Sequence, residues 1–271
     1  MVRMNQEGAV LRFESVHRFF HTGGQLVRAM DGVDLEVKAK GIVTVVGPSG
    51  SGKTTLIRLA AGLDYPDSGK VWRRETSKLG VVFQEPRLLR SLTVEGNVLL
   101  GLGPQKATRN NLDRVQEILA LLGLYKFRRA YPDQLSGGLA QRVALGRALV
   151  RQPELLLMDE PFSALDAPLR RRLQDELLAL LELQAMSVVF VTHDLAEAIY
   201  LGDRILVMRS GRIVWNGPIE LERPRDLRSA PFHSIQDALA QLLGVDKDPP
   251  TIAGSALARG LDECSNEESI A

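Results

Sequence analysis

The sequence predicts an α/β fold, a mostly parallel, twisted sheet with helices on its faces. Residues 42–46 (Ile-Val-Thr-Val-Val) are β-branched throughout and almost entirely apolar, which is typical of a strand buried on both faces. A glycine-rich turn follows this strand at once. From residue 138 onwards, short apolar runs alternate with longer helical segments. Strands that alternate with helices along the chain are typical of a parallel sheet joined by crossover helices.

Strands and turns are expected in the N-terminal part. Residues 9–46 are predicted to form strands, and in residues 33–37 apolar side chains alternate with acidic ones, as on a sheet with one face in solvent. A helix is expected over Lys53–Ala61, because a glycine follows it and glycine commonly ends helices. The turn residues 66–69 (Pro-Asp-Ser-Gly) predict a further short strand pair that ends at Phe83.

The middle of the chain, over about residues 92–151, is predicted to be a helical insert. One helix is expected to start near Asn110 or Asn111, with an apolar face formed by Leu112, Val115, Ile118, Leu119 and Leu122. The α/β alternation then predicts helices over 138–151, 167–184 and 195–201, strands over 155–158 and 187–191, and a hairpin over 204–215 that turns at Ser210-Gly211.

Composition and charge limit the classes of function. The chain of 271 residues is 45% hydrophobic and 25% charged, and its 34 Lys and Arg against 33 Asp and Glu leave a formal charge of +1. This is a globular composition, without the strong positive field that attracts nucleic acid or anionic lipid. No apolar run reaches the roughly 18–20 residues of a membrane-spanning helix. The single cysteine, Cys264, excludes an internal disulfide.

A phosphate-binding loop is predicted between the buried strand and the first helix. Residues 47–54 (Gly-Pro-Ser-Gly-Ser-Gly-Lys-Thr) fit the pattern G-x-x-x-x-G-K-[ST] between a strand and a helix. Glycines allow successive backbone N–H groups to surround phosphate oxygens, and the helix N-terminus adds the positive end of its dipole. Lys53 is expected to neutralise the β- and γ-phosphates, and the Thr54 hydroxyl to bind Mg²⁺. The sequence therefore predicts a P-loop NTPase.

Two acidic residues are predicted to complete this site. Asp159 and Glu160 follow the apolar run 155–158, and ligands of parallel sheets bind at the carboxyl ends of the strands. Asp159 is expected in the Mg²⁺ shell, and Glu160 as the general base that polarises the attacking water. The alternative, that these acids only cap the next helix, is weakened by the presence of Lys53.

Further motifs narrow the class. Residues 135–142 (Leu-Ser-Gly-Gly-Leu-Ala-Gln-Arg) resemble the signature motif of ATP-binding cassette (ABC) proteins, and they precede Asp159-Glu160 by the interval which that family uses. Gln84 resembles the family's Q-loop glutamine, residues 163–166 (Ser-Ala-Leu-Asp) its D-loop, and His193 its switch histidine. The order of these motifs is also the family's. The chain therefore resembles an ABC nucleotide-binding domain, a fold with an antiparallel β subdomain and a helical insert.

The resemblance implies a division of the chain and a set of nucleotide ligands. The ATPase cassette would span residues 1–217, with its helical subdomain at about 92–151. Residues 218–271 would be a C-terminal extension that is flexible from about Val245. The residues that would hold the triphosphate of ATP are Gly47, Pro48, Ser49, Gly50, Ser51, Gly52, Lys53, Thr54 and Thr55.

The resemblance also implies roles for residues outside the phosphate loop. Gln84 would join Thr54 and Asp159 at Mg²⁺ and sense the attacking water. Glu160 would be the base, and His193 would contact the γ-phosphate.

An aromatic residue is expected to stack on the adenine. Phe20 is the candidate and Phe19 the alternative.

The signature residues are implied to act on a second subunit. One cassette per chain implies a homodimer, in which Ser136, Gly137 and Gly138 would serve the nucleotide bound by the other subunit. ATP would close this dimer and hydrolysis would release it. Leu139 stands where the family usually has glutamine.

Transport partners follow from the same resemblance. A chain without a membrane span would need integral-membrane permease subunits, docked near Gln84 and the helical insert, and would lie on the cytoplasmic face of the cell membrane. Residues 83–89 and 191–198 resemble the nitrate, sulfonate and taurine importer branch, which usually has Pro-Trp in place of Arg90-Ser91. A small anion or related solute, delivered by a separate solute-binding protein, is the expected substrate.

The alternative is a soluble ABC ATPase that acts on nucleic acid or ribosomes. DNA-repair members carry a long coiled coil between the Q-loop and the signature motif, and translation members join two cassettes in one chain. The sequence has neither feature, so no nucleic-acid partner is expected. A cassette that binds ATP without hydrolysing it is disfavoured by Lys53, Glu160 and His193.

Overall fold

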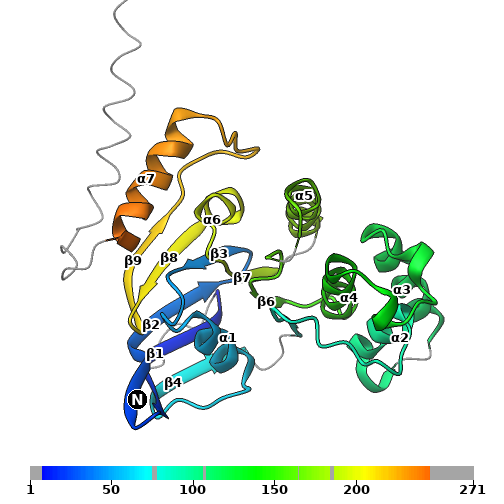
Figure 1. Cartoon of the computed structure of the whole chain (residues 1–271), viewed down its shortest axis with the longest axis horizontal. Coiled ribbons are helices and arrows are strands. Elements are labelled where there is room, and N and C mark those ends of the chain that lie inside the picture. Colours follow the sequence, from blue (N-terminus) through cyan, green and yellow to red (C-terminus); the bar gives the residue numbers. More distant parts are fainter. Residues whose placement is uncertain (1–7, 75–77, 106–107, 164, 184–185, 245–271) are drawn as a thin grey trace, which may run out of the picture.

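The computed structural model describes residues 8–74, 78–105, 108–163, 165–183 and 186–244. Cys264 and the tail beyond Val245 lie outside these ranges. The described residues form a three-stranded antiparallel sheet, a six-stranded and largely parallel sheet, and helices around them (Figure 1). The expected α/β fold is confirmed.

The smaller sheet has the strand order β2-β1-β4. Its strands are β1 (Ala9–Thr22), β2 (Gln25–Lys38) and β4 (Ser68–Arg73). β1 and β2 form a hairpin that turns at Gly23 and Gly24, both with positive φ, which suits a tight hairpin turn. Along β2, Val33, Leu35 and Val37 are buried while the residues between them are not, as their alternation predicts.

The larger sheet has the order β5-β6-β7-β3-β8-β9. Its strands are β5 (Leu79–Val82), β6 (Leu155–Asp159), β7 (Ser187–Val191), β3 (Gly41–Val46), β8 (Arg204–Arg209) and β9 (Arg212–Pro218). Only β9 pairs antiparallel among these strands. β3 is buried on both faces, since Ile42 and Val46 belong to one apolar core and Val43 and Val45 to the other.

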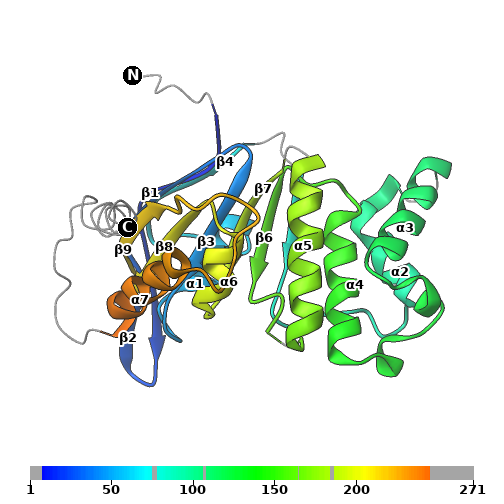
Figure 2. The same ribbon diagram turned by 90° about the horizontal axis from the view of Figure 1, so that it is seen from above.

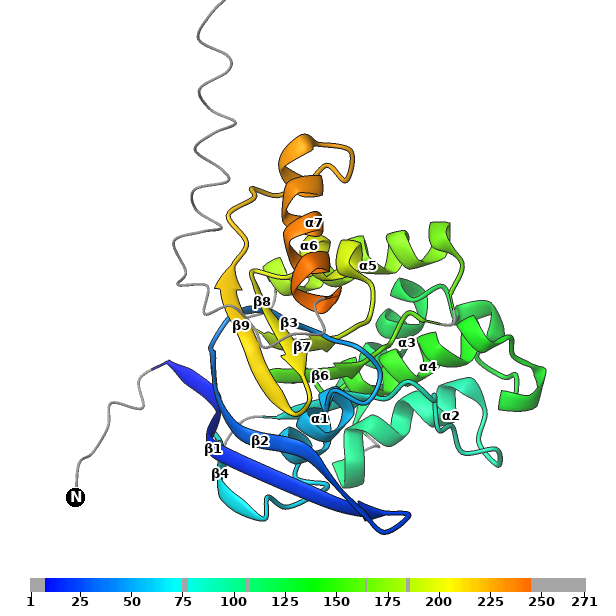
Figure 3. The ribbon, with the colours of Figure 1, turned by 60° about the vertical axis from the view of Figure 1, so that its left-hand side comes forward.

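Helices cover both faces of the larger sheet. α1 (Lys53–Ala61) is buried in the core that also contains the inner face of the small sheet. The opposite core receives α5 (Ala167–Leu183), α6 (Leu195–Leu201) and α7 (Ala230–Gly244). Figure 3 shows α6 and α7 together beside β8 and β9.

The helical insert lies to one side of the sheet, beyond β6 and α5 (Figure 2). It contains α2 (Val94–Leu99), α3 (Arg109–Leu121), α4 (Gly137–Leu149) and the 3₁₀ turns Leu100–Gln105, Tyr125–Phe127 and Pro132–Gln134. Its apolar core joins that of the sheet. Among the described residues, no helix has the length and apolar character needed to cross a membrane.

The structure differs from the predicted elements in several places. The strands β4 and β5 do not pair with each other, because β4 joins β1 in the small sheet and β5 joins β6 in the large one. The helix α2 falls within the predicted helical insert but is not predicted as a separate helix, and α7 is not predicted from the sequence. Leu112 is expected on the apolar face of α3, but it is 45% exposed, since it lies in the first turn, where the helix extends past the core. The last strand, β9, continues to Pro218.

Candidate functional site

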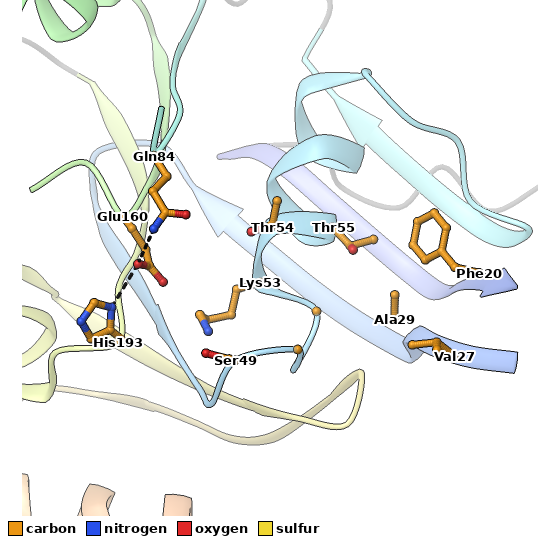
Figure 4. A pocket seen from close by; sticks show the side chains of 12 residues that line it. Phe20, Val27, Ala29, Ser49, Lys53, Thr54, Thr55, Gln84, Glu160 and His193 are labelled. Carbon is orange, nitrogen blue, oxygen red and sulfur yellow. Dashed lines mark hydrogen bonds and ion pairs between the residues drawn. The ribbon is translucent and has the colours of Figure 1, made fainter. Parts of the chain in front are cut away.

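A cavity of about 630 Å³ opens between the two sheets at the N-terminus of α1. Figure 4 shows the side chains that line it, from the phosphate loop, the β1–β2 hairpin and the ends of the parallel strands. The lining residues are Phe20, Val27, Ala29, Ser49, Gly50, Gly52, Lys53, Thr54, Thr55, Gln84, Glu160 and His193. All of these except Val27 and Ala29 are predicted as site residues from the sequence, so ten of the predicted residues line one space. The predicted residues Gly47, Pro48, Ser51 and Asp159 do not line it.

The loop between β3 and α1 has the backbone shape of an anion cradle. Gly50 and Gly52 have φ of 79° and 104°, values that other residues rarely adopt. A Cβ on Gly52 would lie 2.1 Å from the Ala29 carbonyl oxygen, and one on Gly47 would lie 2.3 Å from that of Met208. The chain approaches too closely for side chains here, and the free N–H groups at the start of α1 point to the cavity rim.

Lys53 is held within this loop. Its Nζ donates to the carbonyl oxygens of Gly47 at 2.8 Å and Pro48 at 2.9 Å. Burial lowers the pKa of Lys53, while the nearby carboxylates of Glu160 and Asp159 raise it. Ser51 is buried, and its Oγ has no hydrogen-bond partner within the described chain. A buried cation and a hydroxyl that has no partner among the described residues thus lie in one loop, as suits a phosphate site.

The two acids at the end of β6 have different surroundings. Asp159 is 5% exposed, and burial raises its pKa, although a hydrogen bond from the Thr54 side chain opposes the rise. Glu160 has a left-handed backbone, with φ of 45°, and its N–H donates to the Val191 oxygen at 2.9 Å. The chain therefore turns at Glu160 and directs its carboxylate into the cavity.

Two neighbours hold the carboxylate of Glu160. Gln84 Nε2 donates to Glu160 Oε2 at 3.3 Å, and His193 Nδ1 lies 3.0 Å from the same oxygen (Figure 4). Gln84 follows β5 and His193 follows β7, the strands on either side of β6. The parallel order of three adjacent strands thus brings these polar residues together at one edge of the sheet.

The far end of the cavity is aromatic. Phe20 lines it, opposite Val27 in the β1–β2 register, whereas the Phe19 N–H donates to Asp67 Oδ2 at 2.6 Å on the edge toward β4. The guanidinium carbon of Arg18 lies 4.8 Å from the centre of the Phe20 ring. Of the two candidates, Phe20 lines the cavity and Phe19 does not.

The apolar neighbours of Phe20 are not predicted from the sequence. Val27 and Ala29 follow from the hairpin register, and the Gly23-Gly24 turn is the sequence signal that fixes that register.

The signature residues lie elsewhere. Ser136 caps α4, with its Oγ accepting from the Leu139 N–H at 3.3 Å. Neither Ser136 nor Gly137 and Gly138 lines the cavity of its own chain. Ser136 and Gly137 are at least partly exposed, so the N-terminus of α4 is open to a second molecule. Leu139 is half-buried against the core that also receives α5, α6 and α7.

The donor set also fits a magnesium ion. The Thr54 hydroxyl, the Gln84 amide oxygen and the Asp159 carboxylate are oxygen donors of the kind that Mg²⁺ prefers. Among the residues that the structure describes, no three His, Cys, Asp or Glu side chains form a metal-binding group. Mg²⁺ at phosphate sites is usually bound through one or two protein groups, together with waters and substrate phosphates.

The fold and the site together define a P-loop nucleotide-binding protein. The phosphate loop follows β3, and the carboxylates of Asp159 and Glu160 lie at the end of β6, with β7 between these two strands. Comparison with known proteins gives the family. A family model described as ABC transporter matches residues 30–163. An uncharacterized ABC transporter ATP-binding protein of Methanocaldococcus jannaschii is 43% identical over 242 residues, which cover 86% of this chain and 91% of that protein. The chain belongs to the ABC transporter ATP-binding proteins, and it is an ATPase.

Other relatives have more specific names. The aliphatic sulfonates import ATP-binding protein SsuB 1 of Pseudomonas fluorescens is 44% identical over 225 residues, which cover 83% of this chain and 84% of that protein. A probable sulfate/thiosulfate import ATP-binding protein CysA of Chlorella vulgaris is 45% identical over 200 residues, with 70% and 85% covered.

A solved structure has the same fold. A dimeric ATP-binding cassette in a post-hydrolysis state, bound to ADP and Pi, superposes with a TM-score of 0.73 at 31% identity, covering 78% of this chain and all of that one.

Proposed function

We propose that this chain drives the import of a small anion of the sulfonate, sulfate or nitrate class. The relatives named for sulfonate and sulfate import support this solute class. The placement of Glu160 between Gln84 and His193, facing the phosphate loop, supports hydrolysis as the driving step.

The residues around the cavity divide the chemistry between them. The backbone N–H groups of the loop and the Lys53 ammonium bind the triphosphate, and Phe20 stacks on the adenine. Thr54, Asp159 and Gln84 would hold Mg²⁺, which would supply neutralisation of the phosphate charge when bound. Glu160 accepts the proton of the attacking water as general base.

His193 acts beside this base. It orients the Glu160 carboxylate and reaches the γ-phosphate.

A second copy completes each site. The N-terminus of α4, at Ser136, Gly137 and Gly138, is open to solvent and does not line the cavity of its own chain. Its free N–H groups would meet the γ-phosphate bound by the partner cassette, so the homodimer closes with ATP and opens after hydrolysis.

Membrane subunits supply the transport path. The chain would act at the cytoplasmic face of the membrane, bound to permease subunits near Gln84 and the helical insert, with a separate solute-binding protein delivering the anion. The alternative of a soluble ATPase on nucleic acid or ribosomes is not favoured, since the relatives named above for a solute are import proteins.

Reconstitution with the co-purifying membrane subunits tests the proposal. In liposomes, ATPase activity should rise several-fold when an alkanesulfonate, sulfate or nitrate is added with its binding protein. A Glu160→Gln complex should bind ATP but show no stimulation. Co-purification with ribosomes or nucleic acid instead of a hydrophobic partner would contradict the assignment, and stimulation only by a cationic or sugar solute would contradict the anion class.

A further inference from the structure

A buried hydrogen-bond network lies beneath the loop that carries His193. Its members are Thr192, at the end of β7, Gln174 on α5, and Glu197 on α6. They expose only 2%, 5% and 7% of their surfaces. None of them lines the cavity, so the network is separate from the groups that meet the nucleotide.

The carboxylate of Glu197 determines how the network is oriented. Thr192 Oγ1 donates to Glu197 Oε2 at 2.5 Å, and Gln174 Nε2 donates to Glu197 Oε1 at 2.9 Å. Burial raises the pKa of Glu197, while the hydrogen bonds from Thr192 and Gln174 act in the opposite direction. In this geometry both carboxylate oxygens accept, one from the Gln174 amide and the other from the Thr192 hydroxyl. The single hydroxyl proton of Thr192 is therefore directed at Glu197.

This orientation leaves the lone pairs of the Thr192 hydroxyl free for the backbone. They accept from the Asp194 N–H at 3.1 Å. That N–H belongs to the peptide that joins His193 to Asp194. The hydrogen bond therefore fixes the plane of the peptide on the C-terminal side of His193. At the other end, the Thr192 N–H, in the peptide that joins Val191 to Thr192, donates to the Val45 oxygen of β3 at 3.1 Å. The two-residue segment Thr192-His193 is thus held at both ends.

The side chain of His193 depends on this support. It is 64% exposed, and its Nδ1 lies 3.0 Å from Glu160 Oε2. An exposed ring has few packing contacts, so the backbone that carries it sets its position. We propose that Thr192, oriented by Glu197, is a positioning residue for ATP hydrolysis, which holds the peptide after His193 so that the imidazole faces Glu160 and the phosphate loop. The inference rests on the role proposed above for His193.

The chain offers a matched control for testing Thr192. Thr44 is also a fully buried threonine, on the neighbouring strand β3, and its Oγ1 donates to the Ala198 oxygen of α6 at 3.3 Å. The variants Thr192→Val and Thr44→Val each remove one buried hydroxyl between the sheet and α6 at constant shape. Only the first removes the bond that holds the peptide after His193.

The measurements are kcat, KM and Kd for ATP, and Tm, on the purified full chain. Thr192→Val should lower kcat about tenfold, because displacements of about an ångström in a catalytic group cost up to about 100-fold. KM and Kd for ATP should stay within about twofold, since the phosphate loop is untouched. Thr192→Ser keeps the hydroxyl and should restore kcat. Thr44→Val should lower Tm by a similar amount and leave kcat unchanged.

The series separates this inference from the role of His193 itself. His193→Ala should lower kcat at least as much as Thr192→Val. A low kcat in His193→Ala with a wild-type kcat in Thr192→Val would overturn the positioning role alone. A wild-type kcat in His193→Ala would overturn the role of the histidine and the inference with it. Equal losses of kcat in Thr192→Val and Thr44→Val would show general loosening and also overturn the inference.

A second variant covers failure of Thr192→Val to fold. Glu197→Gln keeps the volume of the side chain but places an amide group, which donates, against Thr192 or Gln174. The hydroxyl is then no longer held toward a carboxylate, and kcat should fall about threefold at unchanged Kd for ATP. A wild-type kcat in this variant would overturn the inference.

Discussion

Glu160 shows how one strained residue can aim a functional group. Its φ of 45° lies in the left-handed region, which costs a residue with a side chain about 1–3 kcal/mol. The turn is held by the Glu160 N–H bond to Val191 and by the pairing of β6 with β7. Hydrogen bonds of the sheet thus stabilise the strained backbone. The turn directs the carboxylate of Glu160 toward Gln84 and His193.

Tyr200 gives a prediction about pH at the residue scale. The residue is 5% exposed, and its hydroxyl donates to Asp175 Oδ1 at 2.5 Å, which ties α6 to α5. Burial, together with this bond, raises the pKa of Tyr200 to about 12. Between pH 10 and 12 the unfolded tyrosine loses its proton and the folded one keeps it, so the free energy of unfolding falls by about 1.4 kcal/mol per pH unit.

Urea unfolding of wild type and Tyr200→Phe tests this. Below pH 10 the wild type should be more stable by about 1 kcal/mol, through the hydrogen bond. This advantage should shrink as the pH rises through 10 toward 12, whereas the phenylalanine side chain of the variant has no proton to lose. A difference between the two proteins that stays constant up to pH 11 would show that the pKa of Tyr200 is not raised.

Site residues that belong to one local motif were predictable from the sequence. Contacts between site residues that are far apart in the chain were less predictable. Lys53 and Thr54 lie beside the glycines that create their setting, so one motif identifies them all. The contact between Glu160 and His193 joins residues that are far apart in the chain, and only the order β5-β6-β7 creates it. The support of His193 by Thr192 and Glu197 depends on a side-chain geometry that no local pattern encodes.

At the scale of elements, the sequence did not predict features that depend on tertiary contacts, such as a short helix and the pairing of two strands. α2 has only six residues, too few for a helical period to show. The strands β4 and β5 are close in sequence, which suggests a hairpin, but topology sends them to different sheets. By contrast, β3 and β7 were predicted, because a strand buried on both faces must be apolar along its whole length.

The helix α7 yields a prediction about stability. Phe232, Ile235 and Leu239 are buried in the core that α5 and α6 form with the larger sheet. Phe232 is 1% exposed, so Phe232→Ala should lower the free energy of unfolding by about 3–5 kcal/mol. Phe127→Ala is the control, since Phe127 is 39% exposed and its loss should cost less than about 1 kcal/mol.

Chemical denaturation and ATPase assays of the two variants measure the effect. The folded fraction of Phe232→Ala should keep the wild-type KM for ATP, because α7 does not line the cavity. A loss of stability no larger than that of Phe127→Ala would mean that α7 is not part of the core in solution.

At the scale of the whole molecule, the proposed function implies that each chain presents two unlike halves of a nucleotide site. The cavity with Lys53 and Glu160 is lined from the phosphate loop and the two sheets, and the N-terminus of α4 does not line it. The helix α4 belongs to the helical insert, apart from α1 (Figure 1). A pair of chains related by a two-fold axis would bring each half to its complement and create two equal sites. The connection between transport and hydrolysis would then lie in the approach of the two halves.

Gly137 can test this arrangement without disturbing the single chain. A Cβ built on Gly137 meets nothing within 4 Å, whereas one on Gly138 would lie 2.9 Å from Leu165 Cδ2. Since alanine also favours a helix over glycine, Gly137→Ala should keep or slightly raise Tm and leave the Kd of the monomer for ATP unchanged. In the closed dimer, however, the added methyl group would lie between the N–H groups of α4 and the partner's γ-phosphate.

The slow-turnover variant Glu160→Gln provides the background in which to see this effect. Without its general base, Glu160→Gln should elute as a dimer in ATP and as a monomer without nucleotide. Glu160→Gln with Gly137→Ala should stay monomeric at the same ATP concentration, although it still binds ATP. If the double variant forms the dimer as readily as Glu160→Gln does, the N-terminus of α4 does not meet the partner's nucleotide, and the two halves of the site must come together in another way.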